Sequence, residues 1–437
     1  MMCSKGLATL LCVIALSSYT SARDYKCTFE ESQQCVFRGV QLKSADQLAS
    51  NTFSSSGTAP RNVKFVSSTM AVVPTAVFQR FANVEQLDSS FSGIKTLSGD
   101  TFAGANNLRE LNLTGNKISS LPNNLFNGAK KITTLDFSQN YISDIQESTF
   151  TGLNQLRVLK LDNNQIATLP AAVFNPLTSL EALDLQRNML SKIDDSLLAS
   201  CTSLISLNVS HNVLQKFETK QFLREWSVDA IDVSFNRLKA ISIPKNLRKL
   251  VASNNQIQSV QVLGKEPALI FLRLSHNKLT SVDPIPSFNK LVTLDLSHNQ
   301  IESFDFSSVT KFRNLILLKL DGNRLTTVSN SLVSDVTYLK YVHLAHNQLT
   351  RLDMETLRTL PRILKLDLGY NKLTQVDAKH ISDRFPVLVR LVLTGNDFQC
   401  DKIADLVKEL KHAITEYKTT ADQCKTGQRL VGGICCS

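Results

Sequence analysis

Apolar residues recur along most of the chain at fixed distances from an asparagine. The nine-residue frame reads L-x-x-L-x-L-x-x-N, and an early copy consists of Leu108, Leu111, Leu113 and Asn116. The frame closes on thirteen asparagines: Asn116, Asn140, Asn164, Asn188, Asn212, Asn236, Asn255, Asn277, Asn299, Asn323, Asn347, Asn371 and Asn396. Two degenerate copies end on serine before them. Alternating apolar residues predict a short strand with one inward face, and neighbouring copies must stack to bury that face.

The repeat predicts an α/β solenoid of about 15 coils, curved into a horseshoe, with a parallel sheet on the concave side. At about 4.8 Å between strands, the inner sheet is on the order of 70 Å long. The asparagine is expected to point inward and to satisfy backbone groups of adjacent turns, because an unpaired group costs roughly 1–3 kcal/mol. Phe102, Phe126, Phe150 and Phe174 recur every 24 residues and predict a core spine on the convex side rather than a binding stripe.

The middle of the array is irregular. Successive asparagines are 24 residues apart as far as Asn236. The next interval, to Asn255, is 19 residues, and the two after it, which end at Asn299, are 22 residues each. Four prolines fall in these short repeats, at Pro244, Pro267, Pro284 and Pro286. They favour extended outer segments over helical ones and a change of curvature across residues 237–298. A bend that serves a ligand and simple tolerance of deletions both remain open.

The pattern resembles the extracellular leucine-rich-repeat family over about residues 60 to 400. The rest of the family's 24-residue unit is matched by Ile118, Leu121, Pro122 and Phe126. The resemblance implies a non-enzymatic protein that binds another macromolecule. The prediction divides the chain into an N-terminal cap at 23–59, the repeat solenoid at 60–399 and a cysteine-containing helical cap at 400–437.

The first residues have the layout of a secretory signal peptide. Lys5 precedes an uncharged apolar run from Gly6 to Leu16, and small residues follow as far as Ala22. The run is shorter than the roughly 20 residues that span a bilayer. We therefore predict a signal peptide at 1–22 and a secreted, extracellular protein without a membrane span.

Seven of the nine cysteines lie outside the predicted signal peptide. Cys201 occupies the position of Leu153 and Leu177 in the two preceding repeats, which predicts a buried free thiol. Cys27 and Cys35 are expected to pair and to close a hairpin over the first edge of the sheet.

The other four cysteines, Cys400, Cys424, Cys435 and Cys436, bracket a predicted helix within 401–418. They allow three pairings, although adjacent cysteines are poorly placed to bond each other. If Cys400 pairs with Cys424, the last two cysteines could link a disulfide dimer, whereas a cap that uses all four leaves a monomer.

The double cysteine, preceded by Asn396-Asp397-Phe398-Gln399-Cys400, resembles the mosquito leucine-rich-repeat immune proteins. That resemblance implies a secreted innate-immune protein whose partner is a complement-like thioester protein. Members of that family usually continue into a coiled coil, which this sequence lacks after Cys436, so coiled-coil assembly is not implied.

Strand positions that folding does not constrain change in character along the array. The C-terminal half combines apolar and basic residues there, which predicts a partner-binding surface of Lys249, Phe271, Arg273, Leu317, Lys319, Tyr341, His343 and Arg390. Sideways packing between repeats is the alternative. Glycosylation sequons at Asn112 and Asn208 share one outward position; if used, they shield the N-terminal half.

Charge and motifs narrow the function further. The formal net charge of +10 is mildly basic and favours anionic partners, while secretion argues against nucleic acid. His211, His276, His298 and His346 each precede a repeat asparagine, where turn formation explains them better than metal binding. No catalytic or nucleotide-binding motif occurs, so we expect no enzyme, cofactor or metal.

The function expected from these patterns is immune recognition or adaptor activity through the concave face. The alternatives are direct binding of an anionic microbial glycan or lipid at the microbial surface, and a role as a cell-adhesion or developmental ligand.

Overall fold

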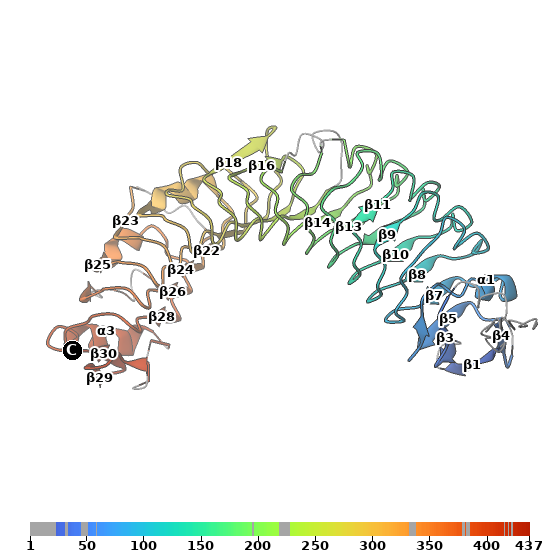
Figure 1. Cartoon of the computed structure of the whole chain (residues 1–437). Coiled ribbons are helices and arrows are strands. Elements are labelled where there is room, and N and C mark those ends of the chain that lie inside the picture. The colour runs from blue at the N-terminus through green and yellow to red at the C-terminus, as the bar shows by residue number, and fades with distance from the viewer. Residues whose placement is uncertain are drawn as a thin grey trace, which may run out of the picture.

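The computed structural model describes residues 23–30, 34–44, 51–57, 59–194, 196–217, 228–331, 338–377, 381, 385–414, 416–417, 419–420 and 423–437. The predicted signal peptide at 1–22 lies outside these residues. The chain winds into a curved solenoid, with a cap at each end of the arc (Figure 1). The family's horseshoe, with its parallel inner sheet, is confirmed.

Fifteen short strands line the concave side and run parallel to one another. They are β5 (Asn62–Val66), β7 (Gln86–Asp88), β8 (Glu110–Asn112), β10 (Thr134–Asp136), β12 (Val158–Lys160), β13 (Ala182–Asp184), β14 (Ser206–Asn208), β15 (Ala230–Asp232), β17 (Lys249–Val251), β19 (Phe271–Arg273), β20 (Thr293–Asp295), β22 (Leu317–Lys319), β24 (Tyr341–His343), β26 (Lys365–Asp367) and β28 (Arg390–Val392).

The strands are in register, so equivalent residues form rows across the sheet. From β7 onward, the first, second and third residue of each strand align with those of the next, as in Phe271–Thr293–Leu317. We call these the first, middle and third rows. The middle row consists of buried aliphatic residues, whereas the other two rows face the concave surface.

An antiparallel hairpin covers the first edge of this sheet. β1 (Asp24–Glu30) pairs with β2 (Gln34–Arg38), and β2 lies parallel to β5. β4 (Thr52–Ser55) follows on the other side of β1 and completes an 18-stranded sheet. The predicted disulfide between Cys27 and Cys35 is confirmed and ties the hairpin together. Nearby lie β3 (Gln41–Leu42), β6 (Thr69–Met70) and the short helix α1 (Ala76–Arg80).

The outer side of the coils holds little regular structure. Four parallel pairs of short strands lie there: β9 (Ser120–Leu121) with β11 (Asp144–Ile145), β16 (Ala240–Pro244) with β18 (Ser259–Leu263), β21 (Ser303–Asp305) with β23 (Thr327–Ser329), and β25 (Arg351–Asp353) with β27 (Gln375–Asp377). The 3-10 helices η4 (Phe306–Lys311) and η5 (Met354–Leu357) follow two of these strands. The extended outer segments predicted for the short repeats of residues 237–298 are found at β16 and β18, whereas the outer segment that holds Pro284 forms a turn.

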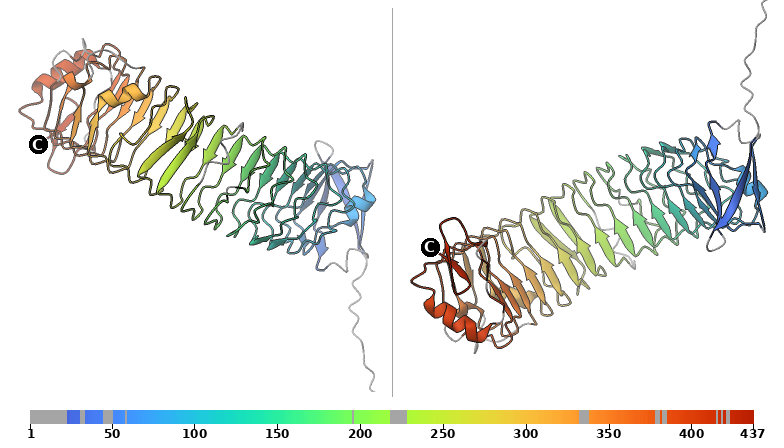
Figure 2. Two further views of the ribbon diagram at one scale, coloured as in Figure 1. Left: turned by 90° about the horizontal axis from the view of Figure 1, so that it is seen from above. Right: turned by 90° about the horizontal axis from the view of Figure 1, so that it is seen from below.

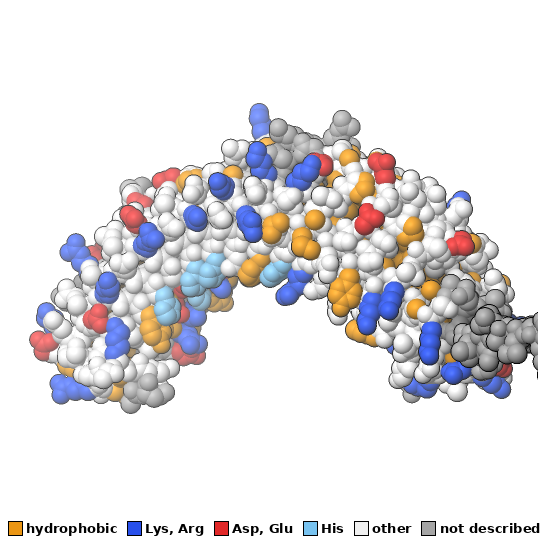
Figure 3. Space-filling view, in the orientation of Figure 1, with side chains coloured by type: hydrophobic (Ala, Val, Ile, Leu, Met, Phe, Trp, Pro, Cys, Tyr) orange, Lys and Arg blue, Asp and Glu red, His pale blue; other side chains and the backbone are white. Residues whose placement is uncertain are grey.

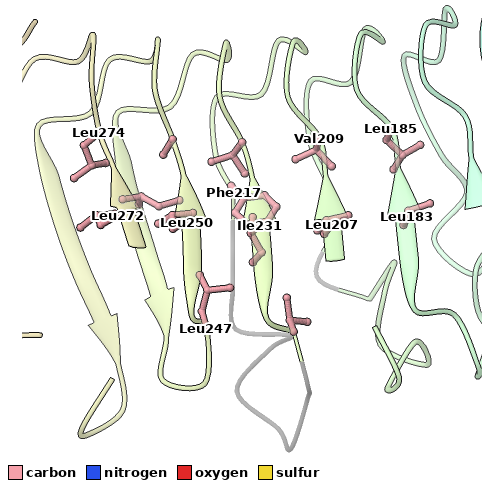
Figure 4. Close-up of a cluster of buried hydrophobic side chains, with 14 of the residues drawn as sticks. Leu183, Leu185, Leu207, Val209, Phe217, Ile231, Leu247, Leu250, Leu272 and Leu274 are labelled. Carbon is pink, nitrogen blue, oxygen red and sulfur yellow. The ribbon is translucent and has the colours of Figure 1, made fainter. Parts of the chain in front are cut away.

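The repeat asparagines bond the coils to one another. Asn212 donates from Nδ2 to the carbonyls of Leu185 (3.0 Å) and Val209 (3.1 Å), and its Oδ1 accepts from the backbone N–H of Leu190 (2.9 Å). Figure 4 shows apolar side chains of successive coils, such as Leu207 and Ile231, stacked beside one another in the core. The Phe spine is confirmed: Phe102 and Phe126 are buried and stack with ring centroids 5.5 Å apart.

The C-terminal cap contains the predicted helix in a shorter form. α3 spans Ala404–Ala413, and Ile414 is already extended. The chain leaves the helix because Glu416 pairs with the last inner strand, accepting from the N–H of Leu391 (3.0 Å) and donating to the carbonyl of Val389 (3.1 Å). This contact covers the second edge of the sheet. β29 (Arg429–Val431) and β30 (Ile434–Cys436) form a closing hairpin.

Both C-terminal disulfides lie within the chain. Cys400 pairs with Cys436 and Cys424 pairs with Cys435, with Cα atoms 5.0 and 5.3 Å apart. The cysteine that the structure leaves unpaired is Cys201, which is buried as predicted. The possible disulfide-linked dimer required Cys435 or Cys436 to be free. Both cysteines form disulfides within the cap, so this prediction is wrong. In the described residues, no helix is long and apolar enough to cross a membrane.

Candidate partner-binding surface

An apolar patch lies on the concave surface over four neighbouring strands, β19 to β24. It includes residues of the first row and residues that directly precede each strand, which we call the leading row. Backbone hydrogen bonds connect the residues of the leading row. The N–H of Val292 donates to the carbonyl of Ile270 (2.8 Å), and the N–H of Ile316 donates to the carbonyl of Val292 (2.9 Å). We define the concave patch as Ile270, Phe271, Val292, Ile316, Leu317 and Tyr341.

The exposure of these side chains lies between what a fully open binding surface and what sideways packing between repeats would give. Tyr341 is 38% exposed, whereas the other five are partly buried. Sideways packing between coils therefore accounts for part of their surface. The rest faces solvent as an uncharged area, because the leading and first rows hold no charged residue at β19, β20 and β22, and Thr293 is the one polar residue among their six positions.

Basic side chains frame one end of the patch at Phe271. Lys249 Nζ lies 5.8 Å from the centre of the Phe271 ring, and the Arg273 guanidinium lies 5.3 Å from it. Arg273 also lies 3.3 Å from Oδ2 of Asp295, which is 5% exposed and accepts from the N–H of Ser297 (3.1 Å). Two cations thus lie over the Phe271 ring, whose negative face attracts them.

The third row adds polar groups beside the patch. His343 Nδ1 lies 4.0 Å from Oδ2 of Asp321. Burial, together with Lys365 and Lys319, holds the pKa of His343 below its usual value in spite of Asp321. His343 therefore presents a neutral imidazole at neutral pH.

Seven of the eight predicted partner-binding residues share the strands from β17 to β24. Arg390 is separated from them by β26 and pairs with Glu416 of the C-terminal cap at 3.5 Å. It lines a separate cavity with Tyr370 and Tyr417. Arg390 thus lies beside the cap and away from the concave patch.

The N-terminal half of the concave face is polar and pairs its charges internally. In the leading row, Arg157 bonds Glu181 at 2.6 Å. In the third row, Lys160 lies 3.1 Å from Asp136. Sequence reasoning missed these cross-strand pairs, although charges of opposite sign one repeat apart are a signal that could have found them.

Both sequon asparagines lie in the third row of this half, Asn112 on β8 and Asn208 on β14. The Oδ1 of Asn208 accepts from the N–H (3.1 Å) and the Oγ (2.8 Å) of Ser210. Their equivalent outward placement agrees with the prediction. Glycans at these sites would cover the strands on the N-terminal side of the concave patch.

A metal site requires several ligating side chains close together. Among the described residues, no group of three or more His, Cys, Asp or Glu side chains is arranged to hold a metal ion. A face of apolar side chains with ion-paired cations is of a kind that can dock a macromolecule.

Comparisons with known proteins agree with the fold. The family model "Leucine rich repeat" matches residues 82–142, 106–166, 130–190, 178–238 and 337–398, and a second model, "Leucine Rich repeats (2 copies)", matches 267–309. A comparison with curated protein sequences found no match.

Similar solved structures include mosquito proteins. The crystal structure of the mosquito LRIM1/APL1C complex matches with 25% identity over 95% of this chain and 71% of that chain, at a TM-score of 0.70. The mosquito APL1 leucine-rich-repeat domain matches with 26% identity over 95% and 99%, also at 0.70. A leucine-rich-repeat protein of Leptospira interrogans shares the fold at 22% identity over 87% and 89%, with a TM-score of 0.63. The chain belongs to the leucine-rich-repeat proteins.

Proposed function

We propose that this protein is secreted and binds another extracellular protein through the concave patch, as a recognition or adaptor factor of innate immunity. The observation that carries the proposal is the patch itself. Six apolar side chains lie on four neighbouring strands of an open sheet, whereas other exposed apolar residues of the leading row, such as Ile205 and Val389, stand on separate strands outside this group. Contiguous apolar area rimmed by polar residues is typical of protein interfaces.

The composition of the patch supports a protein partner. Phe271 and Tyr341 are aromatic, and the Arg273 guanidinium lies 5.3 Å from the centre of the Phe271 ring. Aromatic residues and arginine are enriched among the residues that dominate binding energy at interfaces. The sequons lie in the other half of the concave face, so glycans there would leave the patch open.

The immune role and the partner rest on the similarity to mosquito proteins. One of the similar structures is a complex of two leucine-rich-repeat proteins, LRIM1 and APL1C. The resemblance to the mosquito immune proteins makes a complement-like thioester protein the first partner to test. Disulfides in both caps support an extracellular location, because such bonds persist in oxidising compartments.

An anionic microbial glycan or lipid fits the concave patch less well. Such a ligand needs unpaired cations, but Arg273 is paired with Asp295, and Lys365 lies 3.8 Å from Asp367. Exposed ion pairs contribute only about 0–1 kcal/mol each, but they reduce the net charge that an anion meets.

The proposal predicts that carboxylates on the patch abolish partner binding. We would immobilise the wild type and the triple variant Phe271→Asp, Leu317→Asp, Tyr341→Asp, expose both to haemolymph, and identify captured proteins by mass spectrometry. The wild type should capture the thioester protein and the triple variant should not. Three Asp substitutions at Tyr141, Met189 and Ile205, which are exposed elsewhere, provide the control and should leave capture unchanged. Capture by a folded patch variant would contradict the proposal.

A further inference from the structure

A second surface lies along the edge of the solenoid where the inner strands end. The residue before each repeat asparagine has a left-handed backbone, with φ between 52° and 55° at the ring-bearing positions. These positions, which we call the edge row, carry His211, Phe235, His276, His298, His346 and Tyr370. The histidines that the sequence placed in a turn therefore lie in one row, in which Asn254 and Gly322 separate three pairs of rings.

The rings of the edge row lie flat against the next coil. His211 stacks on Phe235, His276 on His298 and His346 on Tyr370, with centroids 4.1, 4.2 and 4.4 Å apart. Where the next coil has glycine, the ring covers its backbone: a Cβ added to Gly322 would lie 2.4 Å from Nδ1 of His298. Because the rings of neighbouring coils stack on one another, this edge of the solenoid is flat, and the turns that carry the rings are held in place.

A row of cations runs beside the rings. The residue after each repeat asparagine, which we call the cation row, reads Arg237, Gln256, Lys278, Gln300, Arg324, Gln348 and Lys372. Basic residues and glutamines alternate, and all four basic residues are exposed. Neither row contains an acidic residue between 235 and 372. With about 4.8 Å between coils, the cations repeat at about 10 Å over a strip about 30 Å long.

These cations differ from those of the concave face. In the described part of the chain, Arg237, Lys278, Arg324 and Lys372 form no ion pair, whereas Lys160 and Arg273 of the third row both do. In the space-filling view of Figure 3, histidine side chains gather along the concave rim, with lysine and arginine side chains spread over the adjoining face. The strip is therefore a linear array of unneutralised positive charge, which follows the long axis of the solenoid seen in Figure 2.

The positive charge of the strip at neutral pH comes from the cation row. Burial and Arg187 lower the pKa of His211 despite Asp232, and burial and His298 lower the pKa of His276 despite Asp295. Both imidazoles are thus neutral at neutral pH and act as flat polar surfaces.

We propose that this strip binds an extended acidic polysaccharide in which charged and neutral sugars alternate. Guanidinium and ammonium groups would bind the carboxylates or sulfates, and the glutamine amides between them would bond the hydroxyls of the neutral sugars. The regular spacing favours a linear polymer over a compact ligand.

Two other classes of polyanion fit the strip less well. A protein partner would need neighbouring apolar side chains to bury, whereas the two apolar rings of the edge row, Phe235 and Tyr370, lie six coils apart and each already stacks on a histidine. Single-stranded nucleic acid needs free aromatic faces on which bases can stack. The stacked rings of the edge row offer edges instead.

The test uses hyaluronan, which carries a carboxylate on every second sugar. We would measure binding of size-fractionated hyaluronan oligosaccharides to the full chain at low ionic strength, where screening is weakest. The strip variant is Arg237→Gln, Lys278→Gln, Arg324→Gln, Lys372→Gln. The control variant removes the same charge elsewhere, as Lys130→Gln, Lys265→Gln, Lys290→Gln, Arg313→Gln, all exposed positions.

The strip variant should bind roughly tenfold or more weakly, because four exposed charge contacts are lost, while the control variant stays within roughly twofold of the wild type. Longer oligosaccharides should bind more tightly until they span the strip. Equal losses in both variants, or no binding by the wild type, would overturn the proposal. Equal affinity for polyglutamate or single-stranded DNA would overturn the polysaccharide assignment. The concave-patch variant should bind hyaluronan normally, which separates this result from the proposed protein-binding function.

Discussion

Asp136 and Asp184 both belong to the third row and lie two strands apart. The pKa of Asp136 is lowered, whereas the pKa of Asp184 is raised. Burial would raise the pKa of Asp136, but hydrogen bonds from Ser138, Thr114 and Lys160 hold it below its usual value. Burial raises the pKa of Asp184 to about 6, and nearby Asp162 adds to the shift. The repeat therefore fixes where a side chain lies, while its neighbours decide its charge.

The raised pKa of Asp184 predicts a pH-dependent gain in stability when its charge is removed. A carboxyl whose folded-state pKa exceeds its unfolded value stabilises the fold below about pH 4, and this contribution is lost as pH rises through about 6. Asp184→Asn should therefore raise the free energy of unfolding at pH 7 by about 1 kcal/mol, discounted for solvent screening, and have little effect at pH 4.

Asp136→Ala serves as the matched control, because its ionised form is stabilised. It should lower the free energy of unfolding at pH 7. Urea denaturation at both pH values measures the two effects, and a destabilised Asp184→Asn variant at pH 7 would contradict the assigned pKa. Alanine is chosen at position 136 because an asparagine there would form a sequon with Phe137 and Ser138.

At the scale of elements, the terminal disulfides are set by strand pairing. The hairpin of β29 and β30 places Leu430 opposite Cys435 and Arg429 opposite Cys436. A parallel bridge between Phe398 and Cys436 then brings Cys400 to its partner. Cysteine spacing alone could not reveal this register, which is why the sequence left three pairings open.

The pairing predicts three disulfides within each chain and no disulfide between chains. Peptide mapping without reductant should find Cys400 joined to Cys436 and Cys424 joined to Cys435. Cys201 should resist alkylation until the protein is denatured, because burial raises the pKa of its thiol to about 12. A doubled mass that collapses on reduction would contradict this pairing.

The sequence predicted the secondary-structure elements better than the arrangement of the side chains on the surface. The core of every coil requires a residue equivalent to Leu111 and one equivalent to Asn116. The regular spacing of these residues in the sequence therefore reveals the inner strands. Ile270 and Phe271 are not constrained by folding, and their partial burial depends on the side chains of neighbouring coils. Stacking of His276 on His298 could not be expected either, because it requires the left-handed turn to project both rings along the solenoid axis.

Over the whole molecule, the surfaces have separate characters. The N-terminal half of the concave face pairs its charges and carries both sequons, whereas the concave patch lies open in the other half. The strip of unpaired cations runs along the adjoining edge. A solenoid can hold such surfaces side by side because each coil contacts only its neighbours, so surface positions vary without disturbing the core.

The most direct test of the protein-binding claim places a glycan on each half of the concave face in turn. Arg273→Asn creates a sequon with Leu274 and Ser275, and Asp136→Asn creates one with Phe137 and Ser138. Both positions lie in the third row, like the natural sequon asparagines on β8 and β14. Each variant is secreted, its occupancy is confirmed by intact mass, and its affinity for the captured partner is measured, with Arg273→Gln as the charge control.

The glycan at position 273 should weaken binding roughly tenfold or more, because it covers aromatic and arginine contacts that dominate such interfaces. The glycan at position 136 should leave affinity within roughly twofold of the wild type. Full affinity with an occupied site at 273, or loss of binding with the glycan at 136 alone, would contradict the assignment of the C-terminal half of the concave face as the partner-binding surface.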